Sequence, residues 1–523
     1  MTQVDILFER HGPKYRWLVA TTVLLGLVAL GMSITIVNVA TPYISGAFGM
    51  SADQVQWLST GFLAATTVTL LIAPWMVSAF GLRTTYISLL LVFIAASLLG
   101  GTATSMGGIV AARIIQGATT GLVRPVALEA LFLVFPPEQR GMATALYGMS
   151  LGLPLTLATV VGGWTVETYT WHYVFFLVLP LCVAAIVLGY LFLPPREDSG
   201  PRPRLDWFGA VTLFIAIFAL LTAVSNGQRW GWYSESVVGL VVFSVVMGGV
   251  FVAWERRLER PLLDLAMFRH LGFTMGALAL FLFGGVFYAV MYLLPQFSQT
   301  VLQFSPVNAG MLFTPSTVVL FVLVPLVGKL SDRVPPHYLT MPGLAFAVYA
   351  MYRFAQVDSY TSFTYLAVSM TVLSLGMSAF PPPTMARAIA SLPPRLIGYG
   401  SGTINFALQL GGAFATAGLV TMMDRRTAFH GEHLTATLNA DNATAMHTLS
   451  QLQGVLAQVG TSATHQQAAA SHLLGKMDSL SVSVLVYQDG FWAILVGVAL
   501  VAIPSWILGR WSGWSGESAA GGR

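Results

Sequence analysis

One apolar stretch of the chain, residues 107–134, contains the polar side chains best suited to chemistry in a low-dielectric environment. Arg113 and Gln116 are three positions apart, so they share a face if the stretch is helical. Arg124 and Glu129 follow in the same stretch. A charge at the centre of a bilayer costs about 3 kcal/mol or more, so these side chains must face a cavity or a partner. We therefore predict Glu129, Arg113 and Arg124 as candidates for proton coupling.

The charged residues of this stretch also have structural interpretations. Glu129 could lie near the inner end of the stretch and pair with Arg83. Arg124 is either a substrate contact in a cavity or the structural partner of Glu129. The sequence leaves these alternatives open.

Further polar and aromatic residues lie within other apolar stretches. A cavity lined by aromatic rings with few polar groups suits bulky amphipathic ligands. The alternative for any one of these residues is an interhelical hydrogen bond. The predicted cavity residues are Thr35, Asn38, Gln116, Tyr147, Tyr288, Tyr292, Gln296, Asn405 and Gln409.

The elements that must position these residues are membrane helices. The chain is 56% hydrophobic and only 9% charged, whereas soluble domains are about 25% charged. A bilayer core about 30 Å thick requires roughly 20 apolar residues per helix. We predict an all-α polytopic membrane protein with fourteen spans, at about 16–42, 54–79, 84–104, 107–134, 141–165, 171–194, 206–226, 236–254, 272–300, 307–328, 338–355, 362–386, 397–422 and 487–510.

The distribution of Lys and Arg among the connecting segments predicts that both termini are cytoplasmic. The longest segment predicted on the outside, residues 423–486, has partial helical periodicity over 445–459 and 466–484, which predicts a helical hairpin. A charged, Pro-rich linker follows the sixth span. The predicted domains are an N-terminal six-helix bundle, 1–194; a linker with two extra spans, 195–270; and a C-terminal six-helix bundle, 271–523.

One inside loop has residues suited to a conformational latch. Gly328 allows close helix approach, and Asp332 and Arg333 form an acid–base pair at a helix end. The corresponding place in the first half carries Gly81 and Arg83, and we interpret it as a degraded copy of the same loop. The alternative is two unrelated loops.

Other sequence features concern packing and energy supply. Gly162 and Gly163 predict tight helix packing. The Gly-Lys pairs that begin at Gly328 and Gly475 lack the rest of a phosphate-binding loop, so an ion gradient is the predicted energy source. With no cluster of metal ligands and no nucleophile–base set within the spans, we predict neither an enzyme nor a bound metal or cofactor. The net charge of +4 does not indicate a nucleic-acid partner.

Several of these segments resemble motifs of the major facilitator superfamily. The loop 328–333 resembles its signature loop, and 113–117 resembles its span-4 motif. Residues 35–42 resemble the span-1 motif of the fourteen-span drug:proton antiporters, although Ser33 stands where that family usually has an Asp. Residues 171–180 resemble the start of span 6 in the same family.

The resemblance implies two six-helix bundles with two inserted spans. The long outside segment resembles that of EmrB-type multidrug efflux pumps, which implies proton-driven efflux of hydrophobic or amphipathic toxic compounds across a bacterial inner membrane. It also implies a periplasmic adaptor of the EmrA type and an outer-membrane channel of the TolC type. The alternatives are a dedicated exporter of an endogenous siderophore or lipid-like metabolite, which Arg113 and Arg124 would suit if it is anionic, and a membrane sensor or scaffold built around 423–486.

Overall fold

A computed structural model describes residues 3–50, 52–136, 139–196, 205–258, 261–331, 333–437, 443–458 and 462–511. Within these ranges every regular element is a helix. The helices of the first part are α1 Gln3–His11, α2 Tyr15–Phe48, α3 Ala52–Thr69, α4 Ala73–Phe80, α5 Leu82–Gly101, α6 Met106–Val134, α7 Arg140–Thr168, α8 Tyr173–Phe176, α9 Leu179–Phe192, α10 Trp207–Trp230 and α11 Glu235–Glu255. Those of the second part are α12 Leu271–Thr300, α13 Pro306–Met311, α14 Thr314–Ser331, α15 His337–Phe354, α16 Phe363–Ser378, α17 Pro381–Ala390, α18 Ile397–Thr437, α19 Ala443–Gln458 and α20 Ala463–Trp511.

Proline interrupts several of the long apolar segments. The axis bends by 57° between Trp57–Thr69 and Ala73–Phe80, and Pro74 lies in the first turn of α4. Proline lacks an N–H and clashes with the preceding turn, so it ends one helix while it suits the start of the next. The α16–α17 break has the same cause at Pro381. The predicted second and twelfth spans are therefore each two helices.

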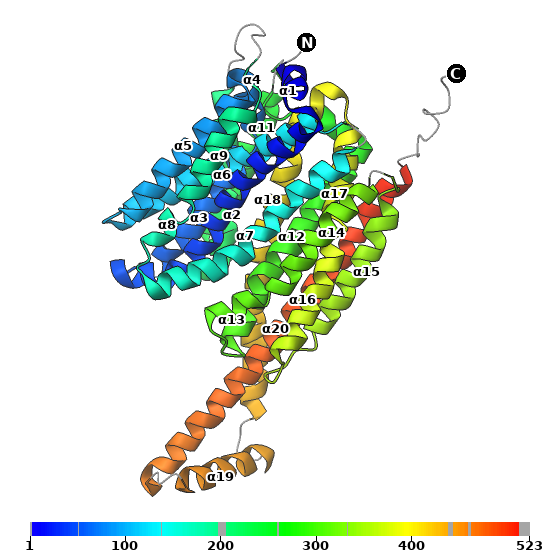
Figure 1. Cartoon of the computed structure of the whole chain (residues 1–523). Coiled ribbons are helices and arrows are strands. Elements are labelled where there is room, and N and C mark those ends of the chain that lie inside the picture. Colours follow the sequence, from blue (N-terminus) through cyan, green and yellow to red (C-terminus); the bar gives the residue numbers. More distant parts are fainter. Residues whose placement is uncertain are drawn as a thin grey trace.

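Helices α2 to α9 pack together as a first bundle, drawn in blue to cyan in Figure 1. Close backbone contact joins α3 to α6, because Gly117 and Gly121 have no side chain to separate the two helices. A Cβ at either glycine would meet a backbone carbonyl oxygen of α3. Thr66 donates a 3.0 Å hydrogen bond to the carbonyl oxygen of Gly117 at the same contact. Small residues and hydroxyl groups are the usual means of helix association in lipid.

The second bundle contains α12 to α18 and α20 (Figure 1). Its tightest contact joins α12 to α18, where a Cβ at Gly284 would meet the carbonyl oxygen of Leu408 and a Cβ at Gly411 would meet that of Phe281. The inner rings of Phe283 and Phe380 are stacked at 4.8 Å between centroids. The bundle is thus held by backbone proximity along one seam and aromatic packing along another.

Helices α10 and α11 form an inserted pair at the periphery. Leu213 and Ile217 of α10 and Phe251 of α11 pack with Val68 of α3 in a small separate core. Ser244 of α11 donates a 2.7 Å hydrogen bond to the Ala216 carbonyl oxygen. The rest of α11 exposes valine side chains, as a helix that faces lipid should.

Eleven helices within the described residues are long and apolar enough to span a membrane, or twelve if the bent α3–α4 segment counts as one span. The less apolar α7 and α15 occupy the positions of the fifth and eleventh predicted spans. The all-helical membrane fold is confirmed, and these helices are consistent with fourteen spans. The three domain boundaries stay predictions.

The helices define two ends of the molecule (Figure 1). Helix α1 and the C-terminal end of α20 lie at one end, which we call the terminal end; α19 lies at the opposite end, which we call the hairpin end. The two stretches with helical periodicity are helical, as predicted. The helices do not stop at 422 and resume at 487, however, because α18 continues to Thr437 and α20 begins at Ala463.

The two bundles contact each other near the terminal end. Thr144 of α7 donates a 3.1 Å hydrogen bond to the carbonyl oxygen of Pro382 in α17. Gly402 of α18 lies against the turn between α3 and α4, where a Cβ would come 3.4 Å from the Leu70 carbonyl oxygen. These contacts place α7 and α18 where each touches the opposite bundle, and both helices carry predicted site residues.

Candidate functional site

A polar cluster joins the two bundles deep inside the protein. Arg124 of α6 donates a 3.0 Å hydrogen bond from Nη1 to Oε1 of Gln409 in α18. The hydroxyl of Tyr288 in α12 donates a 2.8 Å hydrogen bond to the same Gln409 oxygen. Only 7% of Arg124 and 3% of Gln409 are exposed. One amide oxygen therefore receives a cationic donor from the first bundle and a neutral donor from the second.

A second contact between the bundles lies nearby. The Tyr147 hydroxyl of α7 donates a 2.5 Å hydrogen bond to Oδ1 of Asn405 in α18. The amide nitrogen of Asn405 donates a 2.9 Å hydrogen bond to the carbonyl oxygen of Ser401, one turn earlier. Asn405 and Gln409 are four positions apart, so they lie on the same face of α18. We call Arg124, Tyr147, Tyr288, Asn405 and Gln409 the central cluster.

The sequence predicted all five members of the central cluster as candidates but not how they pair. Arg124 meets no carboxylate there: within the described part of the chain, none lies within ion-pair distance of it. Its hydrogen bond goes to a neutral amide oxygen, Oε1 of Gln409. The predicted alternative of an Arg124–Glu129 pair is therefore not what the structure shows.

Arg113 is the centre of a second polar network, within the first bundle. It is 1% exposed. Its Nε donates to the Leu58 carbonyl oxygen at 3.1 Å, and its Nη1 donates to Oε1 of Gln116 at 3.1 Å. Nη1 also reaches the carbonyl oxygen of Ser33 at 3.3 Å and its hydroxyl at 3.4 Å. The face of the Phe62 ring lies 4.3 Å from the guanidinium carbon.

The network ends at Ser97 of α5, whose hydroxyl accepts a 2.9 Å hydrogen bond from Nε2 of Gln116. Arg113 and Gln116 thus point together, as their spacing predicted, but towards α2, α3 and α5. Every acceptor of the Arg113 guanidinium is neutral. Ser33 lies beside the guanidinium, and among the described residues Arg113 has no ion-pair partner.

Glu129 lies about one and a half turns before the end of α6 and is partly buried. Among the described residues it has neither a hydrogen bond nor an ion pair. Arg83, the other predicted partner, donates instead to the Leu193 carbonyl oxygen at 2.5 Å and lies over the Tyr190 ring. A carboxyl with no partner in a membrane helix is chemically able to take up and release a proton.

Among the described side chains, none of the remaining cavity candidates is hydrogen-bonded to the central cluster. Thr35 is on α2, and Tyr292 is partly buried on α12 one turn beyond Tyr288. Gln296 is exposed. Asn38 belongs to α2, but its side chain falls outside what the structure describes.

The latch glycines lie at close contacts. A Cβ at Gly328 of α14 would come 2.8 Å from the Gly141 carbonyl oxygen and would meet Ala145, both on α7. Gly81 has a φ of 82°, which favours glycine, and a Cβ there would lie 2.6 Å from the Cβ of Arg196. Arg333 is exposed. Asp332 lies outside the described residues, so the predicted acid–base pair stays a prediction.

The packing glycines of α7 face two different partners. A Cβ at Gly162 would lie 3.3 Å from Ile36 of α2, and one at Gly163 would lie 3.3 Å from Val307 of α13. Helix α7 therefore fits tightly between its own bundle and the second bundle.

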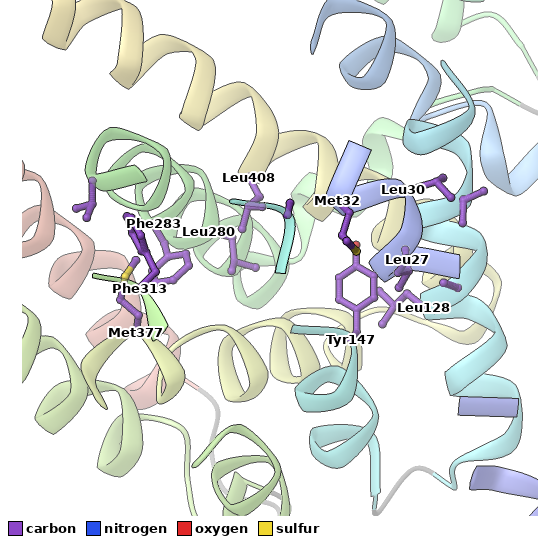
Figure 2. Packing of buried hydrophobic residues seen from close by; sticks show 14 of the residues in the cluster. Leu27, Leu30, Met32, Leu128, Tyr147, Leu280, Phe283, Phe313, Met377 and Leu408 are labelled. Atoms are coloured by element: carbon purple, nitrogen blue, oxygen red, sulfur yellow. The ribbon is translucent and has the colours of Figure 1, made fainter. Parts of the chain in front are cut away.

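An apolar cavity adjoins the central cluster on the side of the second bundle. It encloses about 940 Å³, including space open to the surroundings. Phe283, Phe313 and Met377 of its wall lie together in Figure 2, and Leu408 lies between them and the Met32–Tyr147 group of the first bundle. The cavity lining is Gly148 and Met149 of α7 with residues of α12, α14, α16, α17 and α18, and its few polar groups are hydroxyls such as Ser316 and Ser374.

Sequence reasoning missed several residues of these sites. Ser97 and Phe62 carry no signal in the sequence, because a serine or phenylalanine in an apolar helix is ordinary. Glu255 at the end of α11 is only 3% exposed, although it was placed in an inside loop. One of its oxygens accepts a 3.4 Å hydrogen bond from the Leu263 backbone N–H, and the other is buried without a partner. Because Glu255 adjoins Arg256 and Arg257, the residue types alone indicate a charged surface segment.

Two helical bundles with polar side chains buried between them define a polytopic membrane transporter. Residues 23–416 match the Major Facilitator Superfamily, and the chain belongs to this family. It is 27% identical to the uncharacterized MFS-type transporter YhcA of Bacillus subtilis, over 91% of this chain and 89% of that protein.

The chain is also 27% identical to the multidrug export protein EmrB of Escherichia coli strain K12, over 90% of this chain and 92% of EmrB. Among solved structures, the proton:xylose symporter XylE superposes with a TM-score of 0.59 at 12% identity, covering 94% of this chain and 96% of that one. At this identity the superposition concerns the fold alone. The predicted superfamily and the likeness to EmrB are confirmed.

Proposed function

We propose that this protein exports hydrophobic or amphipathic toxic compounds across the inner membrane and that a proton gradient drives the export. The observation that carries the proposal is the central cluster, in which Arg124 and Tyr147 of one bundle bond to Gln409 and Asn405 of the other. Family members transport by rocking one bundle against the other around a site near the bilayer midplane. The hydrogen bonds of a polar site that spans both bundles would break and form again in each transport cycle.

The relatedness to EmrB, named as a multidrug export protein, supports the direction and breadth of transport. Glu129 is the proposed proton carrier because it is a membrane-helix carboxyl with no partner among the described residues. The span-1 position that usually carries the acid in related antiporters is Ser33 here. Proton release from Glu129 towards the terminal end, which we place in the cytoplasm, would then accompany substrate movement the other way.

We propose further that the hairpin end contacts a periplasmic adaptor of the EmrA type, which leads to an outer-membrane channel of the TolC type. The support is the length of α20, whose 49 residues span about 74 Å at 1.5 Å per residue. This exceeds a bilayer core by more than twofold. Helices α18 and α20 therefore project well beyond the membrane on the side of α19.

The test of proton coupling is efflux of a panel of amphipathic antibiotics and dyes from cells that lack other pumps. We expect wild-type efflux to stop when a protonophore collapses the gradient. The Glu129→Gln variant should still bind substrate but lose efflux at least about tenfold, whereas Glu235→Gln, at an exposed position on α11, should export normally. Wild-type efflux that is indifferent to the gradient would overturn the proposal. Normal, gradient-dependent efflux by the Glu129 variant would remove Glu129 from it.

The adaptor proposal is tested separately by deleting residues 443–458, which form α19. Capture of an EmrA-type adaptor by the full-length protein should be lost while substrate binding is kept. Retained capture would contradict the assignment of the hairpin end. Loss of substrate binding as well would favour the alternative of a scaffold built around this segment.

A second candidate function is export of one endogenous anionic metabolite. The observation that favours it is the pair of buried arginines, Arg113 and Arg124, whose described partners are all neutral. A narrow substrate profile in the same panel, with no change in susceptibility to the antibiotics, would select this function over multidrug export.

A further inference from the structure

The central cluster and the apolar cavity lie next to each other. Three cavity residues directly adjoin cluster residues along the chain: Gly148 follows Tyr147, Phe287 precedes Tyr288, and Leu408 precedes Gln409. Consecutive Cα atoms are about 3.8 Å apart, so the polar wall and the apolar space are neighbours on three separate helices. The cavity and the cluster therefore share three helices, α7, α12 and α18.

The charge of this site has one sign. Arg124 is the only member of the central cluster with a formal charge at neutral pH, and within the described residues it has no ion-pair partner. A buried charge is costly unless it is paired, and removing its counter-charge typically leaves several kcal/mol uncompensated. An anionic group on a ligand would supply that pairing, whereas a cationic group would meet repulsion.

The apolar part indicates the rest of the ligand. The cavity wall is phenylalanine, methionine, leucine and valine with isolated hydroxyls. Methionine side chains adapt to ligands of different shape, and a volume of this order suits a drug-sized molecule. Phe321 of α14 lines the cavity and is also 57% exposed on the outer surface of its helix. The cavity therefore borders the lipid side of α14.

Building on the proposed export function, we propose that the substrate class is the amphipathic organic anion. Its acidic group binds Arg124, with the Tyr288 hydroxyl as a neighbouring donor, and its apolar body occupies the cavity between α12, α14 and α16. The acidic group takes the place of Gln409 Oε1, the atom that accepts hydrogen bonds from both Arg124 and Tyr288 in this structure. Substrate binding exchanges this amide oxygen for a carboxylate or sulfonate oxygen.

The experiment is equilibrium binding of a fluorescent probe to the purified full-length protein in lipid nanodiscs, without a proton gradient. The probe is 11-(dansylamino)undecanoic acid, which is ionised at neutral pH, compared with its uncharged methyl ester. Only the ionised acid can form a charge-assisted hydrogen bond with Arg124, so the wild type should bind the acid at least about tenfold more tightly than the ester.

Variants assign this preference to one residue. Arg124→Gln should bring the acid-to-ester ratio to within about threefold of unity and leave ester binding largely intact, while Arg124→Lys should keep most of the preference. Arg269→Gln, an exposed arginine on the 3-10 helix after α11, is the matched control and should behave as wild type. Equal binding of acid and ester by the wild type would overturn the proposal, as would a preference that survives in Arg124→Gln.

The result is separable from the proposed function. Preferential binding of the acid without gradient-driven efflux of any compound would support the anion site and contradict proton-driven export. Gradient-driven efflux confined to neutral or cationic compounds, with no preference for the acid in nanodiscs, would support export and overturn the anion site.

Discussion

The Arg124 guanidinium and the Gln409 amide oxygen, 3.0 Å apart, join residues 285 positions apart in the chain and on opposite bundles. Arg124 belongs to a helix whose other arginine, Arg113, lies on the same face about three turns away, or about 16 Å along the axis. Arg113 binds only within its own bundle, whereas Arg124 crosses between bundles. Helix α6 thus holds Arg113 inside the first bundle and presents Arg124 at the contact between the bundles.

Replacement of Gln409 by leucine should impair transport. The leucine would leave the Arg124 and Tyr288 donors without their common acceptor in a buried place, which costs about 1–3 kcal/mol. We expect efflux to fall about tenfold and the melting temperature to fall by a few degrees. The control is Gln299→Leu, which makes the same change at an exposed position in the last turn of α12. Unchanged efflux and stability in Gln409→Leu would show that the hydrogen bonds to Gln409 contribute neither to transport nor to the free energy of unfolding.

The sequence named the members of the central cluster among a longer set of candidates because hydrocarbon makes polar residues conspicuous. Tyr147, Tyr288, Asn405 and Gln409 stand out in apolar stretches, and each must find a partner among the few others available. Which residue meets which could not be predicted, because the pairing depends on how α6 and α7 pack against α18. No local pattern in the sequence records that packing.

The errors of the sequence interpretation have physical causes. Hydropathy marks where a helix stops being apolar but not where it stops being a helix, so the continuation of α18 to Thr437 was missed. Glu255 was assigned to a loop because charged residues follow it, yet the turn after α11 folds back and supplies the Leu263 N–H. In both places the backbone continues or turns according to contacts that the residue types alone do not specify.

Restoring an acid at position 33 should stabilise the protein. Ser33 already contacts the Arg113 guanidinium, 3.4 Å from its hydroxyl oxygen. In Ser33→Asp the buried charge would gain a counter-ion, and a double-mutant cycle with Arg113→Leu should show a coupling energy of about 1 kcal/mol or more. The measurement is thermal unfolding of the four proteins in detergent. Additive effects would mean that the aspartate does not reach the arginine.

A methyl group at position 328 should hinder the approach of α14 to α7. Gly328→Ala would place its Cβ 2.8 Å from the Gly141 carbonyl oxygen and against Ala145. Interiors relieve such overpacking only at a cost of about 1–3 kcal/mol, so we expect several-fold slower efflux. Gly398→Ala is the matched control, because a Cβ there meets nothing within 4 Å. If both variants export equally well, the contact is not part of the transport cycle.

Asp489 of α20 should hold α18 and α20 together at the edge of the second bundle nearest the hairpin end, because the adjoining Gln488 donates a hydrogen bond to the Val357 carbonyl oxygen of that bundle. Its Oδ2 atom lies 2.8 Å from His430 Nε2 and 3.4 Å from Arg426 Nε, both on α18. The Asp489 side chain is 29% exposed and that of Arg426 is 46% exposed, so solvent screening limits the contribution to about 1 kcal/mol or less. Asp489→Asn should therefore raise amide hydrogen exchange several-fold in both helices near these residues, while Glu432→Gln, an exposed acid on α18, should leave it unchanged. Since the change acts on how α18 and α20 associate at this edge of the bundle and not on the central cluster, probe binding at Arg124 should stay as in wild type. A loss of that binding would show that the hairpin end is coupled to the central cluster.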